Sequence, residues 1–285
     1  MTTNEGKKLW KRLRVKEFPQ PNYIHIKYPI LFCHGFGSLA SLVKKSPMDE
    51  ICMLYRSHGI LSFAPNIVPY NTIKVRAEAW CHLIDELLEQ TQADKINIIA
   101  HSMGGLDMRY AISEFNMSEK VSSLTTISTP HQGSSLAEWA LSTPARVKVL
   151  LAELLNWVGN SMYPKIQSDV LSATSELTRD HVEEIFNRKI IDAGDVAYYS
   201  YSAAAGKGTK NSIGRILVPF NNHIYQEEGI NDGFVSEQSG HWGKHLGKTN
   251  LSHIEQIKVN LAADRIPVWQ KFWTGVALKL SSFGH

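Results

Sequence analysis

The chain of 285 residues has few cysteines, little excess charge and no long apolar run. Its three cysteines cannot all pair, and Cys33 falls in a stretch that we expect to be a buried strand, so neither a disulfide framework nor a zinc site is predicted. The formal net charge of +3 is far from the dense basic patterning of nucleic-acid-binding proteins. No run is long and apolar enough to span a bilayer. What remains is a globular chain whose 43% of hydrophobic residues suffices for a core.

The N-terminus lacks the apolar segment of a secretory signal, although residues 1–16 are rich in Lys and Arg. We interpret residues 1–22 as a basic arm that is either solvated, part of a transit peptide, or in contact with an anionic membrane. The expected location is cytoplasmic, with a mitochondrial or membrane-peripheral location as the alternative.

Strand-like and helix-like patterns alternate through the first 130 residues. Apolar runs typical of buried strands fall at 29–33, 60–65, 95–100 and 121–128, and helical periods lie between them at 47–58, 72–92 and 104–115. A strand pattern returns at 196–204, a loop is expected over 206–222, and a closing helix over 266–280. Such alternation predicts an α/β fold with a mostly parallel central sheet and helices on both faces.

Residues 134–191 interrupt the alternation with apolar helical patterns. We interpret this stretch as a helical insertion within a single domain that spans residues 1–285. It consists either of ordinary core helices or of a cap or lid whose apolar face touches lipid.

The segment from Ala100 to Gly104 has the pattern of a nucleophile elbow, with Ser102 at its centre. Small residues stand two before and two after the serine, as a sharp strand-to-helix turn requires because bulky neighbours would collide. The turn would raise the Ser102 hydroxyl above the sheet at a helix N-terminus, where a developing negative charge is favoured. Packing around the elbow is the expected role of His101.

A second motif, His34-Gly35-Phe36-Gly37, follows the first buried strand. Acyl transfer needs two backbone N–H groups aimed at the oxyanion. We assign one to Met103, directly after the serine, and the other to Phe36, with Gly35 allowing close approach of the backbone.

An acid and a base are expected after the serine, the acid first. Asp232 occupies an Asp-Gly turn that we expect at a strand end, and His253 begins a helical pattern after a polar loop. We assign His253 as the general base and Asp232 as its orienting carboxylate. Rival acids and histidines remain at Asp192, Asp195, Glu227, Glu228, His241, His245 and His285.

His241 and His245 are four residues apart, a spacing at which a helix could present two metal ligands. Three nearby glycines make a helix unfavourable there, and no third ligand stands out. No metal site is predicted from this pair.

Seven segments of the chain resemble the triacylglycerol lipases of the α/β-hydrolase family, of the Pseudomonas–Proteus type in bacteria and their fungal relatives. They are "YPILFCHGFG", "AHSMGGLDMRY", "TISTPHQGS", "LTRDHVEEIFN" with "VAYYSYSA", and "NDGFVSEQSGHWGKHLG" followed by "SHIEQI". The resemblance covers about residues 28–260. It implies an α/β-hydrolase fold, a Ser102–Asp232–His253 triad with the N–H groups of Phe36 and Met103 as oxyanion hole, and a mobile lid within 134–165.

One departure concerns calcium. Many of these lipases hold a calcium ion with an Asp two residues after the catalytic His and another Asp upstream of the acid. Here Glu255 occupies the first position, and residues 206–222 contain neither Asp nor Glu. We therefore expect no cofactor, with calcium as the alternative.

The predicted function is that of a serine hydrolase acting on carboxylic esters of lipids, most simply a triacylglycerol lipase with peripheral contact to a lipid interface. The alternatives are a carboxylesterase or phospholipase and, in a different class, a catalytically silent binding protein with this fold. No nucleic-acid partner is expected.

Overall fold

The computed structural model describes residues 22–36, 46–142 and 168–285, and every structural statement below concerns these residues. Almost all of the predicted basic arm at 1–22 lies outside them, as do Gly37 and the middle of the predicted insertion. Contact of the arm with membranes therefore stays a prediction. Among the described helices, none is long and apolar enough to cross a membrane.

The centre of the molecule is a parallel sheet with strand order β2-β1-β3-β4-β5-β6. This confirms the predicted α/β class. The strands are β1 (Ile30–Cys33), β2 (Ser62–Phe63), β3 (Ile96–His101), β4 (Val121–Ile127), β5 (Ala197–Ala203) and β6 (Lys244–Thr249).

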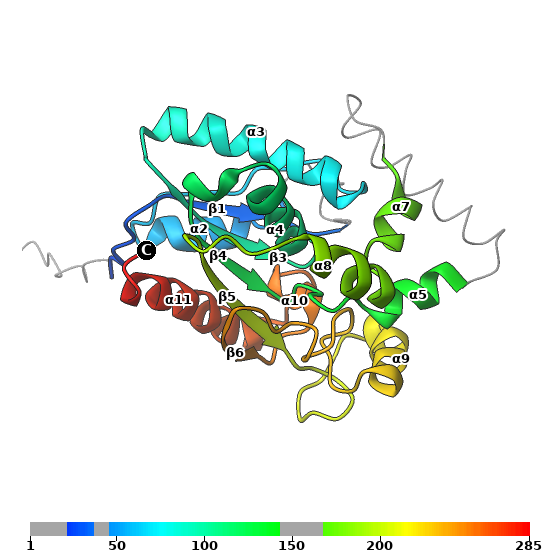
Figure 1. Ribbon diagram of the computed structural model, residues 1–285. Helices are drawn as coiled ribbons and strands as arrows, with labels where there is room; N and C mark the ends of the chain where they lie inside the picture. The colour runs from blue at the N-terminus through cyan, green and yellow to red at the C-terminus, as the bar shows by residue number, and fades with distance from the viewer. Residues whose placement is uncertain (1–21, 37–45, 143–167) are drawn as a thin grey trace, which may run out of the picture.

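Two helical layers cover the sheet, because its central strands are apolar on both faces. Along β1, Ile30 and Phe32 pack with Trp273, whereas Leu31 and Cys33 pack with Trp80 on the other side. The first layer is formed by α2 (Asp49–Ser57) and α11 (Ile266–Ser282), and the second by α3 (Ile73–Thr91) and α4 (Gly104–Glu114) (Figure 1).

Several of the remaining helices gather beyond one end of the sheet, opposite the chain's C-terminus (Figure 1). The carboxyl ends of the parallel strands all lie at this edge of the sheet, and this is the edge at which ligands of α/β proteins bind. The described parts of the predicted insertion are helical there. They comprise α5 (Ser135–Ser142), α7 (Val170–Ser175), a π-helical turn η3 (His181–Phe186) and α8 (Asn187–Lys189). Whether they act as a lid stays a prediction.

Three sequence expectations about the last third of the chain are wrong. The loop expected over 206–222 contains a 3-10 turn (Arg215–Leu217) and the start of α9 (Val218–Glu227). The polar loop expected before His253 contains β6, an edge strand with mostly exposed or half-buried residues and therefore no apolar run to reveal it. Asp232 lies in the loop between α9 and β6, where Asn231 and Ser236 form an isolated bridge, and not at the end of a sheet strand.

Short elements complete the chain. They are the 3-10 turns Met117–Glu119 and Ala263–Arg265, and the single helical turn α10 (His253–Gln256).

Candidate active site

Ser102 lies at the end of β3, in a left-handed backbone conformation with φ of 57°. Its N–H donates to the carbonyl of Ile127 at 3.0 Å, and its carbonyl accepts from the Thr129 hydroxyl at 2.7 Å. A non-glycine residue with positive φ is strained, and these bonds to the end of β4 and to the loop after it hold Ser102 in place. The turn has the geometry that the elbow pattern predicts.

The backbone around Ser102 is packed so closely that two positions beside it have no room for a Cβ atom. A Cβ on Gly35 would lie 2.5 Å from the Cβ of Ser102 and 2.9 Å from the backbone N of Met103. A Cβ on Gly104 would lie 2.8 Å from the carbonyl oxygens of Cys33 and His34. The loop after β1 and the start of α4 are therefore in direct contact, so the backbone of the loop approaches the residue that follows the serine.

A buried ion pair supports this loop. Arg76 of α3 and Asp107 of α4 lie 2.9 Å apart with fully buried side chains, and the Arg76 guanidinium also donates to the His34 carbonyl at 2.7 Å. The His34 ring accepts from the backbone N–H of Ile67 at 3.1 Å. Burial and the nearby Arg76 lower the pKa of His34 to about 3, so its ring is a neutral acceptor. No pattern in the sequence indicated the role of Arg76.

His253 and Asp232 are brought together from separate segments. His253 Nδ1 lies 2.9 Å from Asp232 Oδ2, and the backbone N–H of His253 donates to the Asp232 carbonyl at 3.0 Å. The other carboxylate oxygen accepts from the N–H groups of Phe234 and Val235 at 3.0 and 2.9 Å. Burial alone raises the pKa of Asp232, but His253 and these hydrogen bonds outweigh it and lower that pKa below its usual value.

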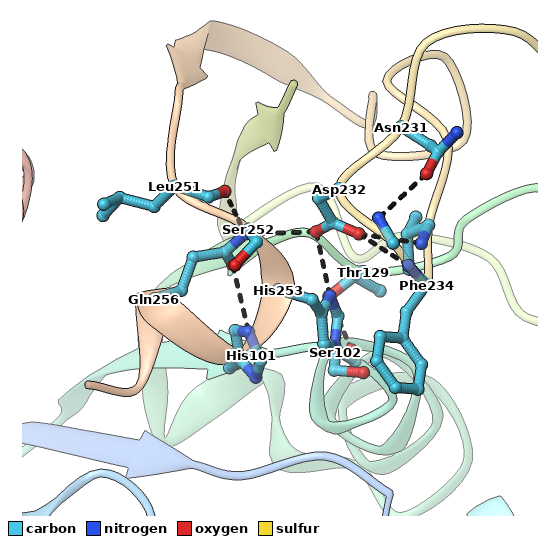
Figure 2. Close-up of polar contacts among 12 residues, drawn as sticks. His101, Ser102, Thr129, Asn231, Asp232, Phe234, Leu251, Ser252, His253 and Gln256 are labelled. Atoms are coloured by element: carbon cyan, nitrogen blue, oxygen red, sulfur yellow. Dashed lines mark hydrogen bonds and ion pairs between the residues drawn. The ribbon is translucent and has the colours of Figure 1, made fainter. Parts of the chain in front are cut away.

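Figure 2 shows Ser102 and Asp232 at opposite ends of the His253 imidazole. One nitrogen of the ring thus contacts the Asp232 carboxylate, and the opposite edge of the ring faces Ser102. This is the arrangement in which an imidazole can take a proton from a hydroxyl while a carboxylate fixes its tautomer.

Gln256 is a site residue that sequence reasoning missed. Its amide nitrogen donates to Asp232 Oδ2 at 3.1 Å, and its amide oxygen faces Nε2 of His101 at 3.0 Å. Burial and the neighbouring His253 lower the pKa of His101 to about 3, so its ring is neutral and can donate to that oxygen. The predicted packing role of His101 omitted this contact, and the only sequence signal was the position of Gln256 in the same helical turn as His253.

Aromatic rings extend outward from the imidazole. Phe234 lies 5.0 Å from His253 between ring centroids, Phe220 lies 5.9 Å from Phe234, and Trp139 lies 5.9 Å from Phe220. Trp139 belongs to α5 and is 41% exposed. The result is an apolar wall that leads from His253 toward the surface.

The rival acids have other partners. Asp192 pairs with Arg109 and Trp242, Glu228 accepts from the backbone N–H of Ser135, and Glu227 lies 3.8 Å from Arg179. Asp195 and His285 line a cavity beside Lys27, and His285 contacts Ser122 and Tyr199.

The two remaining histidines lie against each other. His241 and His245 stack at 3.7 Å between ring centroids, and His245 lies on strand β6 rather than on a helix. Within the ranges that the structure covers, no three His, Cys, Asp or Glu residues are grouped to hold a metal ion.

Comparison with known proteins supports the fold. A sequence-family model described as the alpha/beta hydrolase fold matches residues 28–169. Triacylglycerol lipase 2 of Saccharomyces cerevisiae is 29% identical over 227 residues, which are 76% of this chain and 63% of the yeast protein. A triacylglycerol lipase of Pseudomonas fragi is 26% identical over 264 residues, covering 82% of this chain and 89% of the relative.

Solved structures show the same fold. The mature form of a Bacillus licheniformis lipase superimposes with a TM-score of 0.62 at 22% identity, covering 90% of this chain and 94% of that one. The sheet order, the turn at Ser102 and these similarities lead to one assignment: the chain has the α/β-hydrolase fold, and its relatives include proteins named triacylglycerol lipases.

Proposed function

We propose that the chain hydrolyses carboxylic esters of lipids, as a triacylglycerol lipase, with Ser102 as nucleophile, His253 as general base and Asp232 as the orienting carboxylate. The observation that carries the proposal is the His253–Asp232 contact of 2.9 Å beside a serine held at φ 57°. The similarity to proteins named triacylglycerol lipases supports acylglycerols as the substrate class.

The first half-reaction transfers the acyl group to the enzyme. His253 takes the proton of the Ser102 hydroxyl as the oxygen attacks the ester carbonyl. The oxyanion is held by the backbone N–H groups of Phe36 and Met103. His253, now protonated and stabilised by Asp232, then gives its proton to the leaving alcohol, and the acyl-enzyme remains.

In the second half-reaction, water attacks the acyl-enzyme with His253 again as base, and the fatty acid is released as the Ser102 oxygen regains its proton. The aromatic wall of Phe234, Phe220 and Trp139 supports an apolar substrate, because aromatic side chains offer a large apolar surface beside the reacting groups.

The test is hydrolysis of emulsified tributyrin and triolein by the wild type and by Ser102→Ala, together with labelling by a serine-reactive phosphonate. We expect both triglycerides to be cleaved and the Ala variant to lose several orders of magnitude in rate and all labelling. Cleavage of soluble short esters alone would favour a carboxylesterase. Absence of labelling in a folded wild type would favour a binding protein.

A further inference from the structure

The segment that carries His253 is held at Glu255. Both oxygens of this carboxylate are engaged: Oε2 accepts from the backbone N–H and the hydroxyl of Ser252, each at 2.8 Å, and Oε1 lies 2.8 Å from Nε of Arg265. Ser252 is the residue before His253, so these contacts fix the entry into the turn that presents the imidazole.

Arg265 also reaches the other side of the same segment. Its Nη2 donates to the carbonyl of Asn250 at 2.8 Å and lies 3.5 Å from Glu255 Oε2. One guanidinium therefore joins a carbonyl three residues before His253 to a carboxylate two residues after it. Both side chains are largely removed from solvent, at 18% exposure for Arg265 and 12% for Glu255, so the pair is screened less than a surface pair.

The guanidinium is itself anchored by the core. Arg265 directly precedes α11, whose Trp269 and Trp273 donate through their indole N–H groups to the Gln256 carbonyl at 2.8 and 2.9 Å. Both indoles are buried against the sheet. Helix α11 and the residue before it thus hold both ends of the His253 turn, at Asn250 and at Gln256.

These residues do not fit the calcium ion that many of the lipases in the sequence resemblance hold. Calcium needs six to eight oxygen ligands, usually with more than one carboxylate. Glu255 already has a cation on one oxygen and two donors on the other, and in the part of the chain that the structure covers no second and third acidic or histidine ligand joins it.

We propose that Arg265 is a positioning residue for His253 and supplies, as a guanidinium built into the chain, the positive charge that fixes the His253 turn, so that ester hydrolysis by this protein needs no divalent cation. The proposal rests on the proposed function, since it concerns the base of that reaction. The physical reason is that a guanidinium that belongs to the chain cannot leave the site as a bound ion can.

The first arm of the test uses the full-length wild type with p-nitrophenyl butyrate. Dialysis against EDTA, and then addition of millimolar calcium chloride, should leave kcat and the melting temperature unchanged. Loss of activity in EDTA that calcium restores would overturn the proposal.

The second arm compares Arg265→Ala, Arg265→Lys and the control Lys271→Ala, which removes an exposed cation from the same helix. We expect Arg265→Ala to lower kcat by about 100-fold with little change in KM, because a catalytic group that is displaced by about 1 Å reacts more slowly once substrate is bound. Arg265→Lys should retain part of the wild-type kcat, since it keeps the positive charge but cannot contact the Asn250 carbonyl and the Glu255 carboxylate together. The control should behave as the wild type.

A lower melting temperature with unchanged kcat in Arg265→Ala would reduce Arg265 to a structural residue and overturn the proposal. If the Ala variant does not fold, the same kcat–KM comparison on Arg265→Lys decides. Failure of the proposed function is separate, because it would show as an active Ser102→Ala variant, whatever Arg265 does.

Discussion

Replacing Asp232 by asparagine tests the site most directly, because the carboxylate accepts from four donors that an amide cannot all satisfy. Oδ1 accepts from the N–H groups of Phe234 and Val235, and Oδ2 accepts from His253 and Gln256. An amide offers one oxygen and one NH₂ group. Whichever way the introduced amide is turned, two donors face its NH₂ group.

The two orientations have different costs. If the oxygen faces Phe234 and Val235, the NH₂ group faces His253 Nδ1, which must then lose its proton and carry it on the nitrogen that faces Ser102. The imidazole can no longer act as base, and the comparable change in the serine-protease template lowers kcat about 10⁴-fold, or about 5.5 kcal/mol. If the oxygen faces His253, two buried backbone N–H groups lose their acceptor, at about 1–3 kcal/mol each in stability.

We therefore expect Asp232→Asn to lose either about four orders of magnitude in kcat or about 2–6 kcal/mol in the free energy of unfolding. The assays are steady-state hydrolysis of p-nitrophenyl butyrate and urea unfolding. Asp192→Asn is the matched control: it removes a carboxylate with its own partners, Arg109 and Trp242, and should leave kcat unchanged. An Asp232→Asn enzyme with wild-type kcat and wild-type stability would refute the reasoning.

Three further substitutions follow from the geometry. Gly35→Ala puts a Cβ 2.5 Å from that of Ser102. Because the oxyanion loop must then shift, kcat should fall about 10²–10³-fold. An unchanged kcat would disprove this. Ser102→Gly should be more stable to urea than Ser102→Ala by about 1 kcal/mol, since only glycine relaxes at positive φ; the reverse order would argue against strain. Arg76→Met leaves the buried Asp107 carboxylate with the Trp80 indole N–H as a donor but without its cation. Urea unfolding should therefore show a loss of about 3–5 kcal/mol, and a loss below about 1 kcal/mol would contradict the ion pair's role.

Local patterns were sufficient for the first five strands of the sheet and the helices between the first four. The alternation of apolar runs and helical periods placed β1 through β5 and helices α2, α3 and α4 within a few residues, because buried parallel strands are apolar on both faces. The turn at Ser102 was also local: small residues at 100 and 104 between a strand and a helix allow few other geometries.

Elements without a distinctive pattern were missed. Strand β6 lies at the sheet edge with little apolar surface, so its residues Lys244–Thr249 resembled a loop, and α9 followed a stretch rich in Gly and Asn. The position of Asp232 was likewise mispredicted, because no local pattern marked its loop. Chemistry and chain order selected this acid among several, but it was expected at a strand end.

What the amino-acid sequence by itself determined is the class of fold, the strained turn at Ser102 and the set of residues from which an acid and a base could be chosen. Only the tertiary structure decided that Asp232 faces His253, that Gln256 and His101 extend this contact, and that Arg265 holds the turn through Glu255. The reason is physical: a turn or a strand depends on neighbours in the chain, whereas these contacts join residues whose proximity exists only once the sheet and α11 have packed.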